Sequence, residues 1–378
     1  MRCPRATPAL CRRHPWAEFA WVSDGKSAQA CATGPRQTGA WPSGARALNY
    51  RWVVRLLVTG GAGFIGSNYV RHVLATSDDE VVVYDALTYA GNRSTLADLE
   101  ANPRFRFVEG DICDPAAMRA AIASVNAVVH FAAESHVDNS IAGPDVFMTT
   151  NCGGTNIVMR ACLDAGVERV VHISTDEVYG SVEEGSSLES DRLEPRSPYS
   201  ASKAGSDLIA LSYHSTYDLP VVVTRSSNNF GPWQYPEKLI PLFVTNLLDG
   251  EPVPLYGDGL NVRDWCHVAD NCAAVDLVLR RGVIGSIYNI GAGNEVPNVE
   301  LTHRILALVG ADESMITPVA DRLGHDRRYS VDTGRIRALG WAPTRDLDTA
   351  LEETVDWYRS HRSWWEPLKR STGASASR

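Results

Sequence analysis

The stretch that most limits the fold is a short apolar run that leads into a glycine-rich loop and then into a helical pattern. Val54–Thr59 is predicted to be a buried strand, Gly60-Gly-Ala-Gly63-Phe-Ile-Gly66 follows at once, and apolar residues then recur at helical spacing to Leu74. Glycines permit a tight turn and let the backbone approach a pyrophosphate, which binds at the N-terminus of the following helix. Because such a loop can also be an ordinary turn, its context in the neighbouring segments must show whether it binds a pyrophosphate.

That context is a second predicted strand, Val81–Asp85, which ends in a carboxylate 19 residues beyond Gly66. The Asp85 carboxylate can accept hydrogen bonds from an adenosine ribose, and its charge repels a 2′-phosphate. The sequence therefore favours NAD over NADP, with a simple turn residue at a strand end as the alternative.

The alternation of strands and helices continues along the chain. Further β-branched or apolar runs cover 105–108, 127–131, 168–174 and 220–224, and helical patterns cover 145–165 and 199–217. Repeated alternation of this kind is typical of an α/β fold with a doubly wound parallel Rossmann sheet.

After Arg225 the sequence becomes richer in residues that are typical of loops. Residues 226–232 and 256–265 are rich in turn formers, and shorter helical patterns cover 238–249, 268–280, 298–309 and 346–360. We predict an NAD-binding Rossmann domain over 53–230 and a smaller C-terminal α+β substrate-binding lobe over 231–368, part of which returns to the Rossmann domain. Residues 369–378 are predicted to be a disordered tail.

Composition limits the class of protein. The 378 residues are 44% apolar and 21% charged with a net charge of -9, which is typical of a soluble globular enzyme and argues against a nucleic-acid binder. No apolar run approaches the roughly 18 residues of a membrane span. The eight cysteines show neither a Cys-x-x-Cys motif nor ligand spacing with histidine, so we expect no metal site and a cytoplasmic location.

Residues 1–52 differ from the rest of the chain. They hold eight Arg or Lys residues against only Glu18 and Asp24, a charge of +6, so the remaining chain carries -15. An Arg-rich, acid-poor start can be a targeting peptide, but a secretory signal would need an apolar segment. We expect this extension to be disordered, or to lie upstream of the true start near Val53 or Val54.

The predicted chemistry centres on two short segments. Thr175, Asp176 and Glu177 follow the strand at 168–174, and Tyr199 and Lys203 stand four apart, so that on a helix they share one face. Parallel strands deliver their last residues to the sheet edge where open α/β folds bind ligands. A neighbouring ammonium favours a phenolate, so we expect Lys203 to lower the pKa of Tyr199 and make it a base. A solvated acidic pair is the alternative.

Two further sets of residues are candidates for ligand binding. Asp111 could meet an adenine or could cap a helix before Pro115, and the small residues Ala132 and Ala133 would let a cofactor pass over a strand end. Cationic groups of the lobe suit a substrate diphosphate, because guanidinium matches phosphate in bidentate geometry. As an alternative, each of these side chains could lie on the solvated surface. The cationic groups are Lys238, Arg263, Arg322, His325 and Arg328.

Residues from about 54 to 365 resemble the dTDP-glucose 4,6-dehydratase family of extended short-chain dehydrogenases/reductases. Seven strings carry the resemblance, and the Thr-Asp-Glu string is the most specific, because related sugar epimerases lack the paired acids. The strings are Thr59–Gly66, Asp85–Asn92, Ala132–Asp138, Ser174–Gly180, Arg225–Pro232, Pro236–Pro241 and Asp321–Tyr329. Departures are small: Ala86 replaces the more usual Lys, Phe230 the usual Tyr and Leu323 the usual Pro.

The resemblance implies NAD-dependent dehydration of dTDP-glucose to dTDP-4-keto-6-deoxyglucose in deoxysugar biosynthesis. Tyr199 takes the proton of the 4-hydroxyl while hydride leaves C4 for NAD⁺, with Thr175 and Lys203 assisting. Glu177 then takes the C5 proton, protonated Asp176 protonates the departing 6-hydroxyl, and the hydride returns to C6. Close like charges favour opposite protonation states in such a pair.

The same resemblance implies the binding residues and the assembly. The cofactor residues are Gly60, Gly63, Phe64, Ile65, Gly66, Asp85, Asp111, Ile112, Ala132, Ala133, Ser135, Thr150, Ser174, Tyr199, Lys203 and Asn228. The substrate residues are His136, Thr175, Asn229, Lys238, Leu239, Arg263, Asn298, Arg322 and His325. The family is commonly a homodimer joined through helices that here are 145–165 and 199–217.

Two alternatives stay open from the sequence. One is a nucleotide-sugar 4-epimerase or a dehydratase for another nucleotide hexose. The other is a non-catalytic NAD-sensing protein, since fold does not fix function. The set of Thr175, Asp176, Glu177, Tyr199 and Lys203 argues against a sensor, which needs no acid pair.

Overall fold

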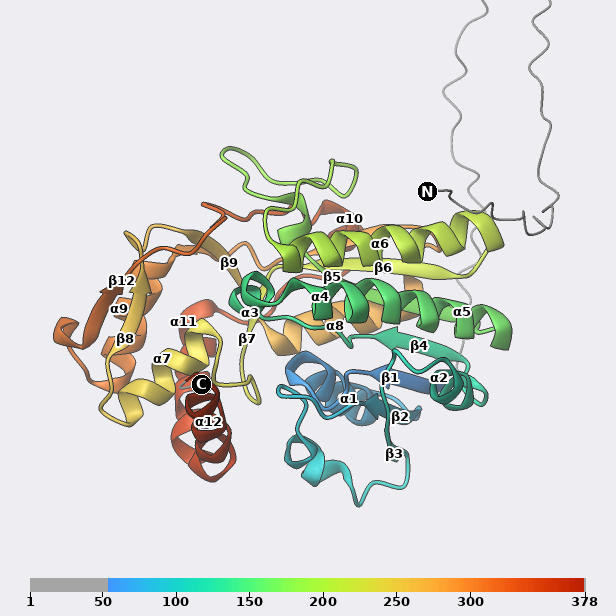
Figure 1. Ribbon diagram of the computed structural model, residues 1–378, viewed down its shortest axis with the longest axis horizontal. Coiled ribbons are helices and arrows are strands. Elements are labelled where there is room, and N and C mark those ends of the chain that lie inside the picture. Colours follow the sequence, from blue (N-terminus) through green and yellow to red (C-terminus); the bar gives the residue numbers. More distant parts are fainter. Residues whose placement is uncertain (1–53, 377–378) are drawn as a thin grey trace, which may run out of the picture. The chain divides into compact units, whose positions relative to one another are not determined.

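A computed structural model describes residues 54–376 of the chain, with side chains described as far as Arg370 (Figure 1). The predictions made for residues 1–52 lie outside the described residues. The disordered tail predicted over 369–378 is wrong as far as residue 376, because helix α12 covers Arg362–Ala376; residues 377–378 lie outside the described part. Within 54–376, no helix has the length and apolar character needed to span a membrane.

The larger part of the fold is a seven-stranded parallel sheet in the order β10-β6-β5-β4-β1-β2-β3. Every neighbouring pair in it is parallel. The predicted doubly wound parallel sheet is therefore confirmed. Its strands are β1 (Arg55–Thr59), β2 (Glu80–Asp85), β3 (Phe105–Glu109), β4 (Ala127–His130), β5 (Arg169–Thr175), β6 (Val221–Ser226) and β10 (Ile287–Ile290).

Helices cover both faces of this sheet (Figure 1). Because strand side chains alternate between faces, Leu56 and Val58 pack in one core with Tyr69 and Cys272, whereas Leu57 packs in a second core with Met118 and others. The first core contains α1 (Phe64–Thr76) and α8 (Val268–Arg281), and the second contains α2 (Pro115–Ile122), α5 (Thr155–Ala165) and α6 (Pro198–Tyr217).

The segment predicted as one helix over 145–165 is interrupted. The structure has α4 (Pro144–Phe147), then a π-helical turn η2 (Met148–Gly154), then α5. The π turn includes Gly153 and Gly154, which are weak helix formers, and such turns often occur at functional sites. Asn151 in this turn donates to Ser202 Oγ at 2.8 Å and to the Glu134 carbonyl at 3.0 Å. The turn therefore fastens this helix to α6 and to the end of β4.

The remaining elements form a smaller lobe with its own apolar core, which includes Phe243, Trp265 and Trp365. Two short sheets run in the orders β11-β9-β7 and β12-β8. The lobe elements are β7 (Asn228–Phe230), α7 (Leu239–Leu248), β8 (Val253–Tyr256), β9 (Val262–His267), β11 (Glu295–Pro297), α9 (Asn298–Val309), η4 (Glu313–Met315), β12 (Ile316–Val319), α11 (Leu347–Ser360) and α12 (Arg362–Ala376).

The chain passes between the sheet and the lobe more than once. After β9 it returns to the sheet as α8 and β10, and Ile336 and Trp341 later join the core that contains α1. The other short elements are η1 (Arg93–Leu99), α3 (Val137–Ala142), η3 (Asp176–Tyr179) and α10 (Gly334–Ala338).

Truncation of Leu57 tests the packing of β1, an interior strand of the sheet. Leu57 has no exposed surface, so Leu57→Ala should lower the free energy of unfolding by about 2–5 kcal/mol through lost burial and a cavity. Leu323→Ala is a matched control, because Leu323 is 78% exposed and its truncation should change that free energy by about 0.5 kcal/mol or less. Urea unfolding followed by circular dichroism measures both, and equal losses in the two variants would contradict this account of the core.

Candidate active site

A cavity of about 610 Å³ lies at the carboxyl ends of the sheet strands and extends under the lobe. All the residues predicted to act in catalysis, cofactor binding and substrate binding line it, from Gly60 in the first loop to His325 in the lobe. The fold thus brings together segments that are far apart in the sequence, and the roles of these residues stay predictions.

The loop between β1 and α1 fits an anionic group. Gly60 has φ of +69°, and a Cβ at Gly66 would come within 2.3 Å of the Gly60 carbonyl oxygen, so both positions require glycine. Helix α1 begins after Gly63 with no side-chain cap and with no acidic residue in its first turn. Its positive end therefore faces the cavity, as a diphosphate would need.

Asp85 lines the cavity and also orders the loop beside it. Its carboxylate accepts from the Ala62 N–H at 2.9 Å and from the Leu87 N–H at 2.8 Å, and burial raises its pKa. Asp111 accepts from the Cys113 N–H at 2.8 Å. Helix α2 is capped by Asp114, so the cap considered for Asp111 belongs to a different residue.

Thr175, Asp176 and Glu177 lie where β5 ends and η3 begins. Thr175 Oγ1 donates to Asp176 Oδ1 at 3.2 Å, and the Glu177 N–H donates to Thr175 Oγ1 at 3.3 Å. Asp176 is 3% exposed, and within the described part of the chain its Oδ2 has no hydrogen-bond partner. The segment therefore holds two carboxyl groups side by side at the cavity wall.

The surroundings of these two carboxyl groups differ. Burial and the charge of Glu177 raise the pKa of Asp176 well above its usual value. Burial also raises the pKa of Glu177, but Arg322, Arg263 and Lys238 oppose that rise. Asp176 is thus the better holder of a proton and Glu177 the better base.

Tyr199 and Lys203 lie one turn apart on α6, which begins with Pro198 and a capping box between Ser197 and Ser200. Lys203 Nζ donates to the Ile173 carbonyl of β5 at 2.7 Å, and burial lowers its pKa to about 8. The prediction of a lowered pKa for Tyr199 is wrong for this structure. Burial raises that pKa well above its usual value, and the charges of Glu177 and Asp176 raise it further.

Cationic groups of the lobe line the far part of the cavity. Arg263 is buried, donates to the Asp326 carbonyl at 2.9 Å and stacks 4.1 Å from the centre of the Tyr329 ring. Arg322 Nη1 lies 4.0 Å from Asp138 Oδ1, and within residues 54–370 its Nε has no partner. These guanidinium groups are held in place beside the cavity.

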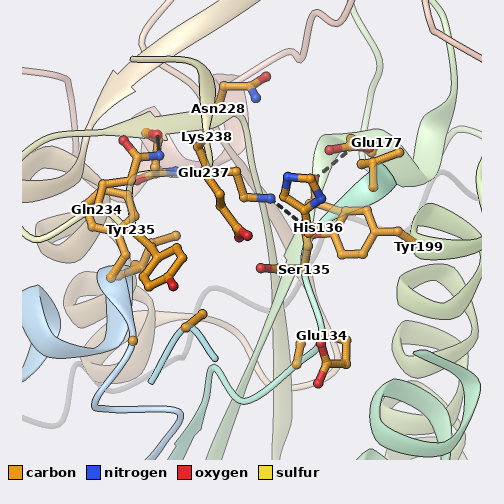
Figure 2. A pocket seen from close by; sticks show the side chains of 18 of the residues that line it. Glu134, Ser135, His136, Glu177, Tyr199, Asn228, Gln234, Tyr235, Glu237 and Lys238 are labelled. Carbon is orange, nitrogen blue, oxygen red and sulfur yellow. Dashed lines mark hydrogen bonds between the residues drawn. The ribbon is translucent and has the colours of Figure 1, made fainter. Parts of the chain in front are cut away.

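The other cationic groups have local partners. Lys238 Nζ donates to the Ser135 carbonyl at 2.7 Å (Figure 2). His325 Nδ1 lies 2.6 Å from Asp321 Oδ1. Arg328 does not line the cavity, because its guanidinium is paired with Glu295 at 2.7 Å. The expectation that it faces the cleft is therefore wrong.

Several lining residues were not predicted. Glu134, Glu237 and Tyr329 stand inside three of the quoted strings, which is a usable signal, whereas Gln234 and Tyr235 lie between strings and have no spacing that would mark them. Figure 2 shows Gln234 and Tyr235 on one side of the view and His136, Glu177 and Tyr199 on the other.

Unsatisfied polar atoms indicate where a ligand would bind. Buried polar groups nearly always have partners, yet several in this cavity lack one within the described residues. They are Ser174 Oγ, Asn228 Oδ1, Asn229 Oδ1, Gln234 Oε1 and Asn298 Oδ1. Together with the glycine cradle they fit a dinucleotide and a second polar ligand. Among residues 54–370, no group of three or more His, Cys, Asp or Glu side chains could hold a metal ion.

The family model described as GDP-mannose 4,6 dehydratase matches residues 57–354. The dTDP-glucose 4,6-dehydratase of Streptomyces antibioticus is 52% identical over 331 residues, which cover 86% of this chain and 98% of that protein. The low-salt glycan biosynthesis protein Agl12 of Haloferax volcanii is 54% identical over 303 residues, 80% of this chain and 98% of that protein.

A solved structure is also similar to this chain. The crystal structure of DesIV, a dTDP-glucose 4,6-dehydratase from Streptomyces venezuelae with NAD and TYD bound, is 59% identical with a TM-score of 0.82, covering 83% of this chain and 99% of that one. The fold, the cavity and these matches agree, and the chain belongs to the GDP-mannose 4,6 dehydratase family, within which it is similar to dTDP-glucose 4,6-dehydratases.

Proposed function

We propose that the protein is an NAD-dependent enzyme that dehydrates dTDP-glucose to dTDP-4-keto-6-deoxyglucose in deoxysugar biosynthesis. The observation that carries the proposal is the adjacent pair Asp176 and Glu177, held beside Thr175 in the same cavity wall as Tyr199. Relatives that are about half identical over most of the chain carry this activity in their names.

The residues present fit NAD. The Gly60–Gly66 loop and the N-terminus of α1 would hold the diphosphate, Asp85 the adenosine ribose, and Lys203 the nicotinamide ribose. When bound, NAD⁺ would accept hydride from C4 of the sugar and return it to C6, and its positive ring would favour a tyrosinate nearby.

Tyr199 and Thr175 serve the oxidation step. The Thr175 hydroxyl interacts with both Tyr199 and Asp176, so it can hold the 4-hydroxyl of the sugar while Tyr199 takes its proton. Because burial and the charges of Glu177 and Asp176 raise the pKa of Tyr199, a tyrosinate base needs positive charge nearby, which Lys203, one turn further along α6, and the bound cofactor would supply.

Asp176 and Glu177 serve the elimination step. Oxidation at C4 acidifies C5, and Glu177 takes the C5 proton. Asp176, whose pKa is raised further, gives its proton to the 6-hydroxyl, which leaves as water. A 4-epimerase has no water to expel and no use for this second pair.

The lobe binds the nucleotide part of the substrate in this proposal. Arg263 and Arg322 provide guanidinium groups for the diphosphate, and Asn229 and Asn298 provide unsatisfied buried oxygens. Lys238 and His325 complete the polar wall.

We also propose a homodimer and a cytoplasmic location. Apolar side chains are exposed on the helices named for the dimer: Leu208 is 59% exposed, Tyr217 52%, Val146 48% and Met148 42%. Such a set on neighbouring helices is typical of an interface. Free thiols such as Cys113 and Cys152 suit a reducing compartment.

The acid pair can be separated from the oxidation step by substitution. The parent protein, incubated with dTDP-glucose, should release a 4-keto sugar lighter by one water. An Asp176→Asn, Glu177→Gln variant that binds NAD⁺ should accumulate enzyme-bound NADH and a 4-keto hexose that keeps its 6-hydroxyl. Tyr199→Phe should slow NADH formation by roughly 10²-fold or more.

Absorbance of NADH and mass spectrometry of the sugar measure these outcomes. UDP-glucose and GDP-mannose are the comparison substrates for the parent protein. Release of the 4-keto-6-deoxy sugar by the double variant near the parent rate would show that elimination uses other acids. Interconversion of 4-epimers by the parent protein would favour the epimerase.

The two guanidinium groups test nucleotide binding. Arg263→Ala and Arg322→Ala should each raise KM for dTDP-glucose by roughly 10- to 100-fold, because losing a charge-assisted hydrogen bond costs about 1.5–3 kcal/mol. Arg327→Ala is the matched control, since Arg327 is exposed and pairs with Asp258 outside the cavity. Steady-state kinetics measures KM for each variant. An unchanged KM in both cavity variants would show that Arg263 and Arg322 do not bind the nucleotide.

The dimer has its own test. Leu208→Asp would place a charge in the proposed interface and should convert the dimer to a monomer at micromolar concentration. Val283→Asp is the control, because Val283 is 60% exposed on the loop after α8. Light scattering after size-exclusion chromatography gives the masses, and a dimer that survives Leu208→Asp would place the interface elsewhere.

A further inference from the structure

A network of buried charges lies behind the cavity wall, and no step proposed above uses it. At its centre are Asp207 of α6, which is 0% exposed, and Arg225 at the end of β6, which is 2% exposed. Arg225 Nε donates to Asp207 Oδ2 at 2.9 Å. Burying two charges in the protein interior is costly, and an apolar pair would fill the space as well. The network therefore calls for an explanation beyond packing.

Arg225 also binds the segment that carries the acid pair. Its Nη1 donates to Tyr179 Oη at 2.8 Å, and the guanidinium carbon lies 4.8 Å from the centre of that ring. Tyr179 Oη in turn donates to Asn289 Oδ1 of β10 at 2.7 Å. Tyr179 is the last residue of η3, two residues after Glu177, so this link fixes the end of the catalytic segment.

Asp207 also lies on α6, the helix that carries Tyr199 and Lys203. It follows Lys203 by four residues on α6, so the two side chains share one face of the helix. Asp207 Oδ1 lies 3.3 Å from His172 Nε2 of β5. One carboxylate thus connects α6, β5 and, through Arg225, η3.

We infer that Asp207 is a positioning residue that, through Arg225 and Tyr179, aligns the Thr175–Glu177 segment with Tyr199 and keeps Lys203 protonated. The inference rests on the proposed function and deepens it, because it concerns the same reaction.

The other ionisable groups near Lys203 leave Asp207 as its counter-charge on α6. Burial lowers the pKa values of His130 and His172 and raises that of Cys152, so all three are neutral near pH 7. Burial acts to raise the pKa of Asp207, but His172 and Arg225 hold it below its usual value. On the cavity side, the remaining groups are Tyr199, Asp176 and Glu177.

The lysines of the chain are Lys26, Lys203, Lys238 and Lys369, so selective labelling of lysine side chains gives a sparse NMR spectrum. Substituting Lys26, Lys238 and Lys369 in turn assigns the Lys203 signal by elimination. Lys203 should titrate near pH 8 in the parent protein. In Asp207→Asn, loss of the counter-charge beside Arg225 should lower the Lys203 pKa by about one unit or more.

The matched control is Asp79→Asn. Asp79 is likewise a buried carboxylate paired with an arginine, Arg280, whose side chain is 30% exposed, and it accepts from the Val54 N–H at 2.8 Å, away from the cavity. This variant should lose stability as Asp207→Asn does, yet leave the Lys203 pKa and kcat unchanged.

Tyr179→Phe tests alignment with less risk to folding. It removes one hydroxyl from Arg225 and should lower kcat by roughly tenfold or more, with KM for dTDP-glucose and the Lys203 pKa little changed. The NMR titration needs no substrate. A parent protein without activity on dTDP-glucose would therefore contradict the proposed function, and the effect of Asp207 on the Lys203 pKa could still be measured. An unchanged Lys203 pKa in Asp207→Asn, or an unchanged kcat in Tyr179→Phe, would overturn the inference.

Discussion

Exclusion of water from the carboxyl end of β5 is the constraint on which the rest of the site depends. Burial is the first cause of the pKa shift in Asp176, Glu177, Tyr199 and Lys203 alike. Desolvation disfavours whichever form is charged, so it pushes the acids and the amine in opposite directions. It therefore raises the pKa values of the two acids and lowers that of Lys203 to about 8, within one wall of the cavity. Water is excluded from this site because the lobe covers the carboxyl edge of the sheet.

Much of this arrangement could be predicted from local sequence. The glycine loop, Asp85 and the strand that ends at Thr175 each carry a short-range signal, and the parallel topology then forces the strand ends to one edge. That is why the sequence predicts that residues as distant as Gly60 and Lys203 lie in one site. The cationic residues of the lobe are predicted from their charge, whereas Asn298, which stands in none of the quoted strings, is predicted only from the resemblance to the family.

The errors have a common physical origin in tertiary contacts. The sequence prediction for the pKa of Tyr199 rests on one neighbour on its own helix, whereas burial and the two carboxylates of η3 decide that pKa in the structure. Arg328 was judged by its charge, and its partner Glu295 is 33 residues away. The π turn at Met148–Gly154 depends on Asn151 reaching Ser202 on another helix. Likewise, Asp207 stands four residues from Lys203, but its connection to Tyr179 runs through β6.

The repeated passage of the chain between sheet and lobe constrains how such an enzyme can diverge. Because α8 and β10 return to the sheet between β9 and β11, and Ile336 and Trp341 return again before α11, no single cut separates the lobe as a continuous piece. Recombination could not exchange this lobe for another as an intact module. New sugar specificity would have to arise by point substitution and by loop length changes at the cavity rim.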